Sequence, residues 1–367
     1  MTDMRATFEV ATIVDAIQRA ARVAPTKGTA LDKAAGIVIE GDPAAIGDPV
    51  VVQSTDLDVT FRTTISALDM GTEPFVWRLP STLLNGFASA LNMDGGSQIE
   101  LFQHDNEVRF KSGKTKAKLN LILGHYPIIP VFDSSKHTDA ASLAMRLKQV
   151  AWAVNNRSLD ILSGVHLDGS YLYGCDRTRL AFVPCVVPVN RPVTAQLTAV
   201  ASTLRNTSEV GVRATETRIE LSPDTHTQVT SRLIEGDYPN VKRLIRDDYS
   251  GEVTIQTDTI NSVIDRMLVI AKNERSTATS IAIGDGSMSM SMQAKGVGMV
   301  ADEFEVVGGT SEPFRLRFDS DSLRRAIVAS GRPQIKLRYG PSNKKPIEVC
   351  DDAGFRAILM PMDPNGV

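Results

Sequence analysis

The sequence predicts an α+β protein made of three tandem copies of one unit, each with two helices against antiparallel sheet. An apolar strand recurs at Leu119–Ile122, Ser231–Ile234 and Ala357–Met362. A proline-containing segment recurs at Pro74, Pro192 and Pro313, roughly 120 residues apart. Solenoid repeats run to roughly 20–50 residues, so this longer period indicates duplicated domains.

The first helix of each copy is predicted from apolar residues at helical spacing. The apolar positions are Val10, Ile13, Val14, Ile17 and Ala21 in the first copy, Leu143, Leu147, Val150, Ala151 and Val154 in the second, and Ile260, Val263, Ile264, Met267 and Ala271 in the third.

The second helix of each copy follows the proline segment. It is predicted over 84–91, 197–204 and 323–327. Ser81 and Asp321 stand where helix N-caps are expected, because their side-chain oxygens can accept from backbone N–H groups of the first turn.

A strand, a polar turn and another strand close each copy. Alternation of apolar and polar residues begins at Gln98, Val210 and Gln334 and is broken by turn residues, which is typical of a hairpin. The order of parts predicts three domains of ordinary size, at 1–133, 134–247 and 248–367.

The composition is that of a globular protein, with 42% apolar and 23% charged residues. No run of about 18 apolar residues occurs, and the first residues lack the pattern of a signal peptide, so we expect a cytoplasmic protein that binds no membrane. The odd number of cysteines (Cys175, Cys185 and Cys350) predicts neither a disulfide framework nor a zinc site.

The distribution of charge is more informative than the net charge of -3. The predicted helices carry mainly Arg and Lys on their polar faces, whereas most acids lie in strands and turns. Arg and Lys are also good exposed helix formers, but the bias is present in all three copies. It favours a surface that meets phosphate groups.

No pattern of a catalytic or cofactor site is complete. Ser112–Thr115 is similar to the end of a phosphate-binding loop, but Val108 occupies the position of the required first glycine. The five histidines share no metal-binding spacing with one another or with cysteine. We therefore expect no metal, no cofactor and no catalytic residue; a hydrolase with a carboxylate site is a distant alternative.

Several spaced segments together resemble the β sliding clamp of bacterial DNA polymerase III, the processivity factor, in a divergent form. They cover essentially the whole chain: Thr55–Val59, Asp176–Ala181, Glu235–Pro239 with Lys242 and Arg243, Asn273–Arg275, and Met360–Met362. Each motif is weak alone, but their order and spacing beside a threefold repeat are specific. The sequence departs from the family at Arg177, Thr178 and Asp363.

The resemblance implies the DNA clamp fold and a head-to-tail homodimer whose six domains close a ring around double-stranded DNA. The helices would face the DNA. A ring held topologically needs only a weak, sequence-independent attraction to phosphates. The DNA-facing residues would be Arg19, Arg22, Lys27, Arg146, Lys148, Arg157, Arg205, Arg266, Lys272, Arg324 and Arg325.

The resemblance also implies a cleft for short apolar peptides of a DNA polymerase catalytic subunit, a clamp loader and other proteins with a clamp-binding motif. The cleft would use Leu162, Cys175, Arg179, Leu180, Pro239, Arg243, Leu244, Val349, Ile358, Met360, Pro361 and Met362. The dimer contact would lie near Leu119, Leu121, Ile270 and Ala271. The alternative is a clamp-like module that binds partner peptides without closing a ring.

Overall fold

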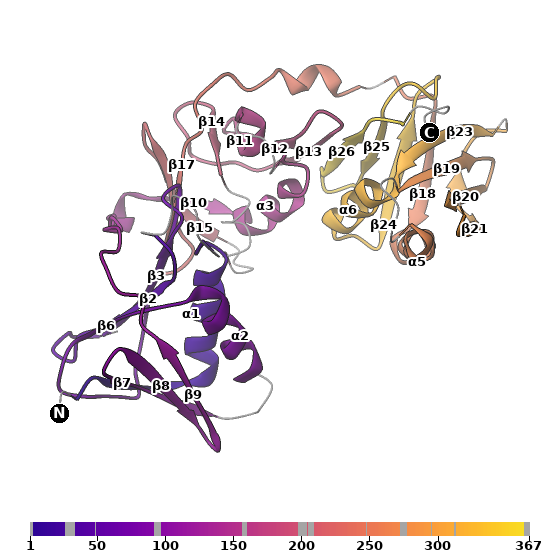
Figure 1. Cartoon of the computed structure of the whole chain (residues 1–367). Helices are drawn as coiled ribbons and strands as arrows, with labels where there is room; N and C mark the ends of the chain where they lie inside the picture. Colours follow the sequence, from indigo (N-terminus) through magenta and orange to yellow (C-terminus); the bar gives the residue numbers. More distant parts are fainter. Residues whose placement is uncertain are drawn as a thin grey trace. The chain divides into compact units, whose positions relative to one another are not determined.

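The computed structural model describes residues 3–25, 34–47, 49–91, 97–155, 160–196, 204, 209–246, 248–271, 277–294, 296–311 and 313–362. The chain forms two compact units (Figure 1). The first contains residues 1–144, 188–190 and 195–233, and the second contains residues 145–187, 191–194 and 234–367. No helix of the described residues is long and apolar enough to span a bilayer.

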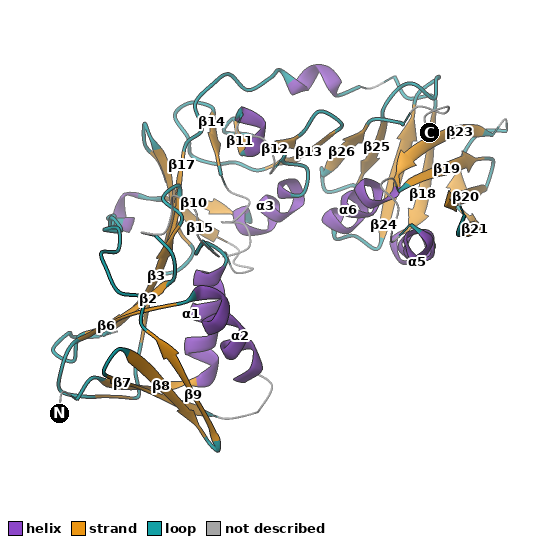
Figure 2. Cartoon of the chain, in the orientation of Figure 1, coloured by secondary structure: helices purple, strands orange, loops and turns teal. Residues whose placement is uncertain are grey.

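The described residues of the first unit form two antiparallel sheets together with α-helices (Figure 2). A five-stranded sheet has the order β5-β1-β7-β8-β9, and an eight-stranded sheet has the order β10-β15-β16-β17-β4-β3-β2-β6. The elements are β1 (Arg5–Glu9), α1 (Val10–Ala21), β2 (Ile37–Gly41), β3 (Val50–Thr55), β4 (Val59–Ile65), β5 (Asp69–Met70), β6 (Phe75–Leu79), α2 (Ser81–Leu91), β7 (Gln98–His104), β8 (Glu107–Ser112), β9 (Thr115–Asn120), β10 (Thr138–Ala141), β15 (Glu209–Ala214), β16 (Arg218–Ser222) and β17 (Thr227–Arg232).

The second unit contains a nine-stranded sheet, β14-β11-β12-β13-β26-β25-β24-β18-β22, and a four-stranded sheet, β21-β20-β19-β23. Its elements are α3 (Leu143–Ala151, which begins at the unit boundary), β11 (Val165–Leu167), β12 (Tyr171–Cys175), β13 (Arg179–Pro184), β14 (Val193–Ala195), β18 (Gly251–Gln256), α5 (Thr257–Ile270), β19 (Ala278–Ile283), β20 (Ser287–Ala294), β21 (Gly298–Glu305), β22 (Val307–Gly308), β23 (Phe314–Asp319), α6 (Ser320–Ser330), β24 (Gln334–Tyr339), β25 (Ile347–Cys350) and β26 (Arg356–Leu359). The described residues also form the short 3-10 helices η1 (Ser134–Lys136), η2 (Ile161–Ser163) and η3 (Val241–Leu244).

The predicted α+β class is confirmed, and so are the three predicted first helices, which correspond to α1, α3 and α5. Each forms because one apolar stripe faces the core: in α5, Ile260, Val263, Ile264 and Met267 are all buried. Of the predicted second helices, α2 and α6 are confirmed, whereas 197–204 falls almost wholly outside the described residues.

The two predicted N-caps are wrong. Asp319 caps α6, because its carboxylate accepts from the backbone N–H of Ser322 (3.2 Å), while Asp321 forms a salt bridge with Arg325 instead. Ser81 is the first residue of α2, and its hydroxyl donates to the carbonyl of Pro25. A cap depends on where the preceding strand ends, which the local sequence does not define.

Both large sheets join strands from either side of the predicted domain boundaries. Strand β17 pairs with β4 in the first unit, and β13 pairs with β26 in the second. The three-domain division itself stays a prediction. The sheets show that neighbouring repeats, if they fold as domains, share continuous hydrogen bonding rather than only side-chain contacts.

We expect Ile264→Ala in α5 to lower the free energy of unfolding by about 2–5 kcal/mol, because the fully buried side chain would leave a cavity. Val269→Ala on the same helix is the control: this side chain is 73% exposed, so its removal should change stability little. Calorimetric unfolding of both variants tests this, and equal effects would show that α5 is not packed as described.

Candidate functional site

The second unit contains an apolar cluster where β12, β13, β26 and η3 meet. It consists of the buried residues Tyr173, Cys175, Leu180, Phe182, Val241 and Ile358, with Leu162, Tyr171, Tyr238 and Ile245 packed against them. Four residues of the predicted peptide cleft (Leu162, Cys175, Leu180 and Ile358) are therefore brought together by the fold.

Strand register explains why these residues share one face. Cys175 lies opposite Leu180 in the β12–β13 pair, and Leu180 lies opposite Ile358 in the β13–β26 pair. Directly opposite residues of antiparallel strands point to the same side. Gly174 lets β12 approach α3 closely, since a Cβ there would lie 2.1 Å from the carbonyl oxygen of Val150.

The rim of the cluster is exposed apolar surface. Leu244 at the end of η3 and Met360 after β26 are each 44% exposed. The backbone N–H of Met360 donates to the carbonyl of Thr178 (2.9 Å), and that of Met362 donates to the carbonyl of Arg317 (2.8 Å). These bonds fix the path of the C-terminal segment, so its methionines can offer an adaptable apolar wall.

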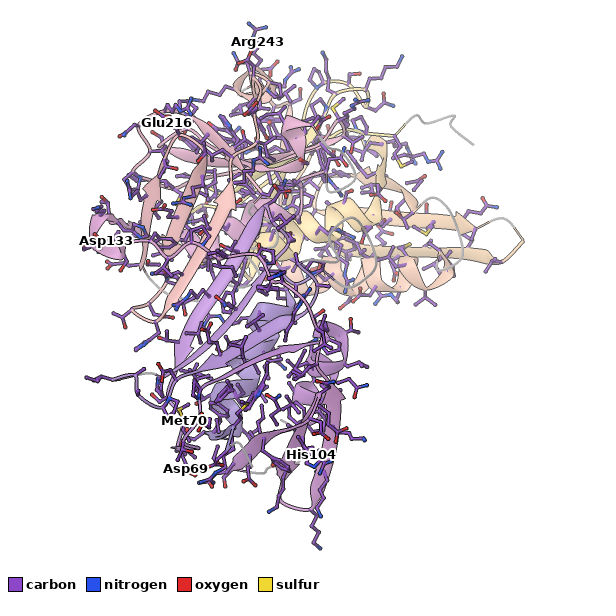
Figure 3. The ribbon with its side chains drawn as sticks, turned by 60° about the vertical axis from the view of Figure 1, so that its left-hand side comes forward. Asp69, Met70, His104, Asp133, Glu216 and Arg243 are labelled. Atoms are coloured by element: carbon purple, nitrogen blue, oxygen red, sulfur yellow. The ribbon has the colours of Figure 1, made fainter. Side chains whose placement is uncertain are left out.

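The remaining predicted cleft residues have different positions. Val349 is fully buried in β25, opposite Ala357 of β26, so its side chain lies on the other face of the sheet from Ile358 and outside the cluster. Pro239 lies beside the cluster and lines a pocket of about 450 Å³. Arg243 projects outward from η3 (Figure 3).

Arg179 is engaged inside the second unit. Its guanidinium pairs with Asp176 (2.9 Å), lies 5.7 Å from the ring centroid of Trp152 and donates to Ser322 (3.3 Å). A side chain held by these contacts orients β13 against α6. These contacts hold the side chain within the second unit, and the predicted role of Arg179 in binding a peptide stays a prediction.

The 450 Å³ pocket adjoins the cluster and was not predicted. His166 stacks on Tyr238 (4.2 Å between centroids), and its Nδ1 lies 2.9 Å from the hydroxyl of Thr194. The carboxylate of Asp168 accepts from Tyr173 (2.9 Å) and pairs with Lys242 (3.0 Å). Alternation along 171–175 is the signal that would have placed Tyr173 beside Cys175.

Burial controls the protonation of these groups. Burial lowers the pKa of His166 to about 4 and raises the pKa of the Cys175 thiol to about 12. Burial also works to raise the pKa of Asp168, but hydrogen bonds from Lys242 and from backbone N–H groups lower it on balance. At neutral pH the cluster thus has a neutral thiol, and the adjoining pocket has a neutral imidazole and one compensated ion pair.

Most of the predicted DNA-facing side chains that the structure describes have acidic partners. Arg266 pairs with Asp302 (3.0 Å), and Arg324 pairs with Asp265 (3.0 Å). Arg19 is only 8% exposed; its guanidinium lies 3.5 Å from Asp15 and 5.2 Å from the ring centroid of Phe61.

The structure describes some of the other predicted DNA-facing residues, and the rest lie in stretches that it does not describe. Arg22 and Lys148 are exposed, and Arg146 donates to Gln149 (3.0 Å). Lys27, Arg157, Arg205 and Lys272 lie outside the described residues.

The predicted dimer residues lie on or next to the ends of two sheets. Leu119 is half-buried on β9, the edge strand of the five-stranded sheet, and Leu121 follows it. Ile270 ends α5, which packs on β20 and the edge strand β21, and Ala271 follows as a buried residue.

Comparisons by sequence and by structure both find bacterial sliding clamps. No protein-family model matches the sequence. The β sliding clamp of Synechococcus elongatus is 25% identical over 308 residues, 78% of each chain, and that of Streptomyces coelicolor is 22% identical over 99% of this chain and 100% of the relative. The DNA polymerase III β subunit of Thermotoga maritima superimposes with a TM-score of 0.78 at 18% identity, covering 98% of this chain and 99% of that one. The chain therefore has the fold of these proteins from end to end.

We expect stability to fall as the pH drops from 6.5 towards 4, in part through His166. Below 6.5 the unfolded chain takes up a proton on this residue, whereas the folded chain does so only near its lowered pKa of about 4. His166→Phe keeps an aromatic ring against Tyr238 and removes the titration, so its stability should depend less on pH in this window. His104→Phe, at an exposed histidine, is the control. Identical pH profiles of wild type and His166→Phe would contradict the assignment.

Proposed function

We propose that this chain, a divergent relative of the β sliding clamps, encircles duplex DNA as a head-to-tail homodimer and tethers a DNA polymerase and other partners. The observation that carries the proposal is the apolar cluster with its exposed rim at Leu244 and Met360, in a fold shared along the whole chain. Under this proposal the protein has no reaction of its own and acts in the cytoplasm on a replicating DNA molecule.

The cluster suits a short peptide with apolar side chains. Its floor is aromatic and aliphatic, its rim includes a flexible methionine, and the adjoining pocket gives room beside Pro239. Desolvation of such a surface by leucine or phenylalanine side chains contributes roughly 25 cal/mol per Å² of apolar area. A clamp loader and a polymerase subunit with similar peptides would then compete for one site.

Closure of a ring is supported by two edge strands of opposite charge. Strand β9 and the turn before it carry Lys114, Lys116 and Lys118, and β21 carries Glu303 and Glu305. Both strands lie at the ends of their sheets, where unpaired backbone groups favour addition of a strand from another chain. Pairing β9 of one copy with β21 of a second makes a heterologous contact, which closes a ring when the rotation is suitable.

A weak electrostatic attraction is what a sliding ring requires. The pairing of Arg266, Arg324 and Arg325 with acids reduces the field at these helices. Each phosphate contact steepens the salt dependence of binding, so a strongly basic surface would hold the ring at one place. Topology rather than affinity would then keep the protein on DNA.

Light scattering should give the mass of a dimer, and protein loaded onto nicked circular DNA should remain there until the circle is cut. Linearisation should release it at a salt concentration that leaves the circular complex intact. A monomer, or release governed by salt alone on both DNA forms, would instead support a module that binds partner peptides without closing a ring.

Charge reversal tests the proposed edge contact. We expect Lys114→Glu with Lys116→Glu to shift the dimer to monomer, because both strands at the contact would then be acidic. Adding Glu303→Lys and Glu305→Lys to the same chain should restore the dimer. Arg232→Glu on β17 is the matched control. A dimer that persists in the doubly reversed variant would place the contact elsewhere.

A further inference from the structure

The four-stranded sheet of the second unit has a hollow on one face. The pocket measures about 290 Å³. It is lined mainly by serines and arginines from three neighbouring strands: Ser280, Ile281 and Ala282 from β19, Ser289 and Ser291 from β20, and Arg315, Leu316 and Arg317 from β23, with Asn343 from the turn between β24 and β25.

The sequence builds this hollow by strict alternation. In β20, Met288, Met290 and Met292 are buried in the core, so the serines between them lie on the opposite face. Ser280 lies opposite both Ser291 and Arg317, and Ala282 lies opposite both Ser289 and Arg315. Short side chains therefore form a floor, and two long guanidinium side chains form a wall beside it.

The charge of the pocket is graded across the sheet. Among the described residues Arg315 is exposed and forms no salt bridge, and Lys344 and Lys345 directly follow Asn343 in the chain. Glu303 and Glu305 lie on the same face but on β21, opposite Ser289 and Ser287. An anionic group is thus attracted to the β23 side of the pocket and repelled from the β21 side.

The β23 side adjoins the candidate partner-binding cluster. The backbone N–H of Met362 donates to the carbonyl of Arg317, so the segment from Met360 to Met362 runs from the cluster onto the edge of β23. A ligand that covers Met360 and Met362 therefore reaches the arginine wall within a few residues, because an extended chain spans roughly 3.3 Å per residue.

We propose that this pocket binds an acidic segment of the same partner peptide that occupies the apolar cluster. The inference rests on the proposed function, and it adds the class of sequence that the partner carries beside its apolar residues. Arginine forks bind carboxylates in two-point geometry, and serine hydroxyls donate to the remaining lone pairs. The hollow measures only about 290 Å³ and has two arginines, so a short acidic segment fits it better than a long nucleic-acid strand.

Fluorescence anisotropy with the full chain tests the proposal. The probes are synthetic peptides that share one leucine–phenylalanine core. One peptide has glutamates before the core, and another has them after it. Peptides with glutamines in the same positions are the uncharged controls. We expect a glutamate flank on one side to tighten binding by about three- to tenfold at low salt, from two partly exposed charge pairs. The advantage should shrink as salt rises.

Substitutions locate the effect. Arg315→Gln with Arg317→Gln should abolish the glutamate advantage and leave the glutamine peptide unchanged, and Lys344→Gln with Lys345→Gln should reduce it. Arg232→Gln, an exposed strand arginine of the first unit, should preserve it. Leu180→Asp in the apolar cluster should weaken all the peptides.

The outcomes separate the two proposals. If wild type binds no peptide, or Leu180→Asp has no effect, the proposed cluster function fails. If wild type binds glutamate and glutamine peptides equally, the cluster stands and the acidic-segment proposal is overturned. If a single-stranded oligonucleotide displaces the glutamate peptide through Arg315 and Arg317 better than a core-free glutamate peptide does, the pocket is a nucleic-acid site and the proposal is likewise overturned.

Discussion

The antiparallel pairing of β13 with β26 is the constraint on which the candidate site depends. It brings Leu180 from the middle of the chain opposite Ile358 near its end, and with them the strands that carry Cys175 and Val349. A slip of one residue in this register would turn Leu180 and Ile358 to opposite faces and divide the apolar cluster. The site is thus a property of the shared sheet, and no single repeat contains it.

A buried carboxylate helps to fix that register. Glu348 of β25 is fully buried and accepts from both Nε and Nη2 of Arg356 on β26 (2.8 and 2.6 Å), from Tyr249 (2.9 Å) and from Arg338 (3.3 Å). The Arg356 guanidinium also lies 5.3 Å from the ring centroid of Phe182 on β13. Removal of one partner from a buried charge network costs about 3–5 kcal/mol, so the network resists displacement of β26. The network thereby holds β26, the strand that leads to Met360 at the rim of the site.

The fold followed from sequence where the period of apolar residues was long and regular. The helical stripe at Val10, Ile13 and Ile17 and the alternation after Gln98 each determine which face is buried, and α1 and β7 confirm both. Helix caps were less predictable, because Asp319 and Asp321 are equally suitable in composition and only the end of β23 decides between them. The cluster residues Leu162, Cys175, Leu180 and Ile358 were found through resemblance, since Ile358 is distant in sequence from the others and only strand register brings it opposite Leu180.

Charged side chains were the least predictable part, for a physical reason. An arginine on a helix has several rotamers and several acids within reach, so its partner depends on strands that are distant in sequence. Arg266 extends to Asp302 on β21, and Arg179 extends to Trp152 and Ser322. Arg315 differs because its strand neighbours are serines and alanine, which offer it no charge. An arginine with an ion-pair partner in its own fold already has part of its field compensated, whereas Arg315 has no ion-pair partner among the residues that the structure describes and can offer its charge to another molecule. By the same reasoning, an arginine surrounded by small neutral side chains is a better indicator of a binding site for an acidic group than a surface with many basic residues.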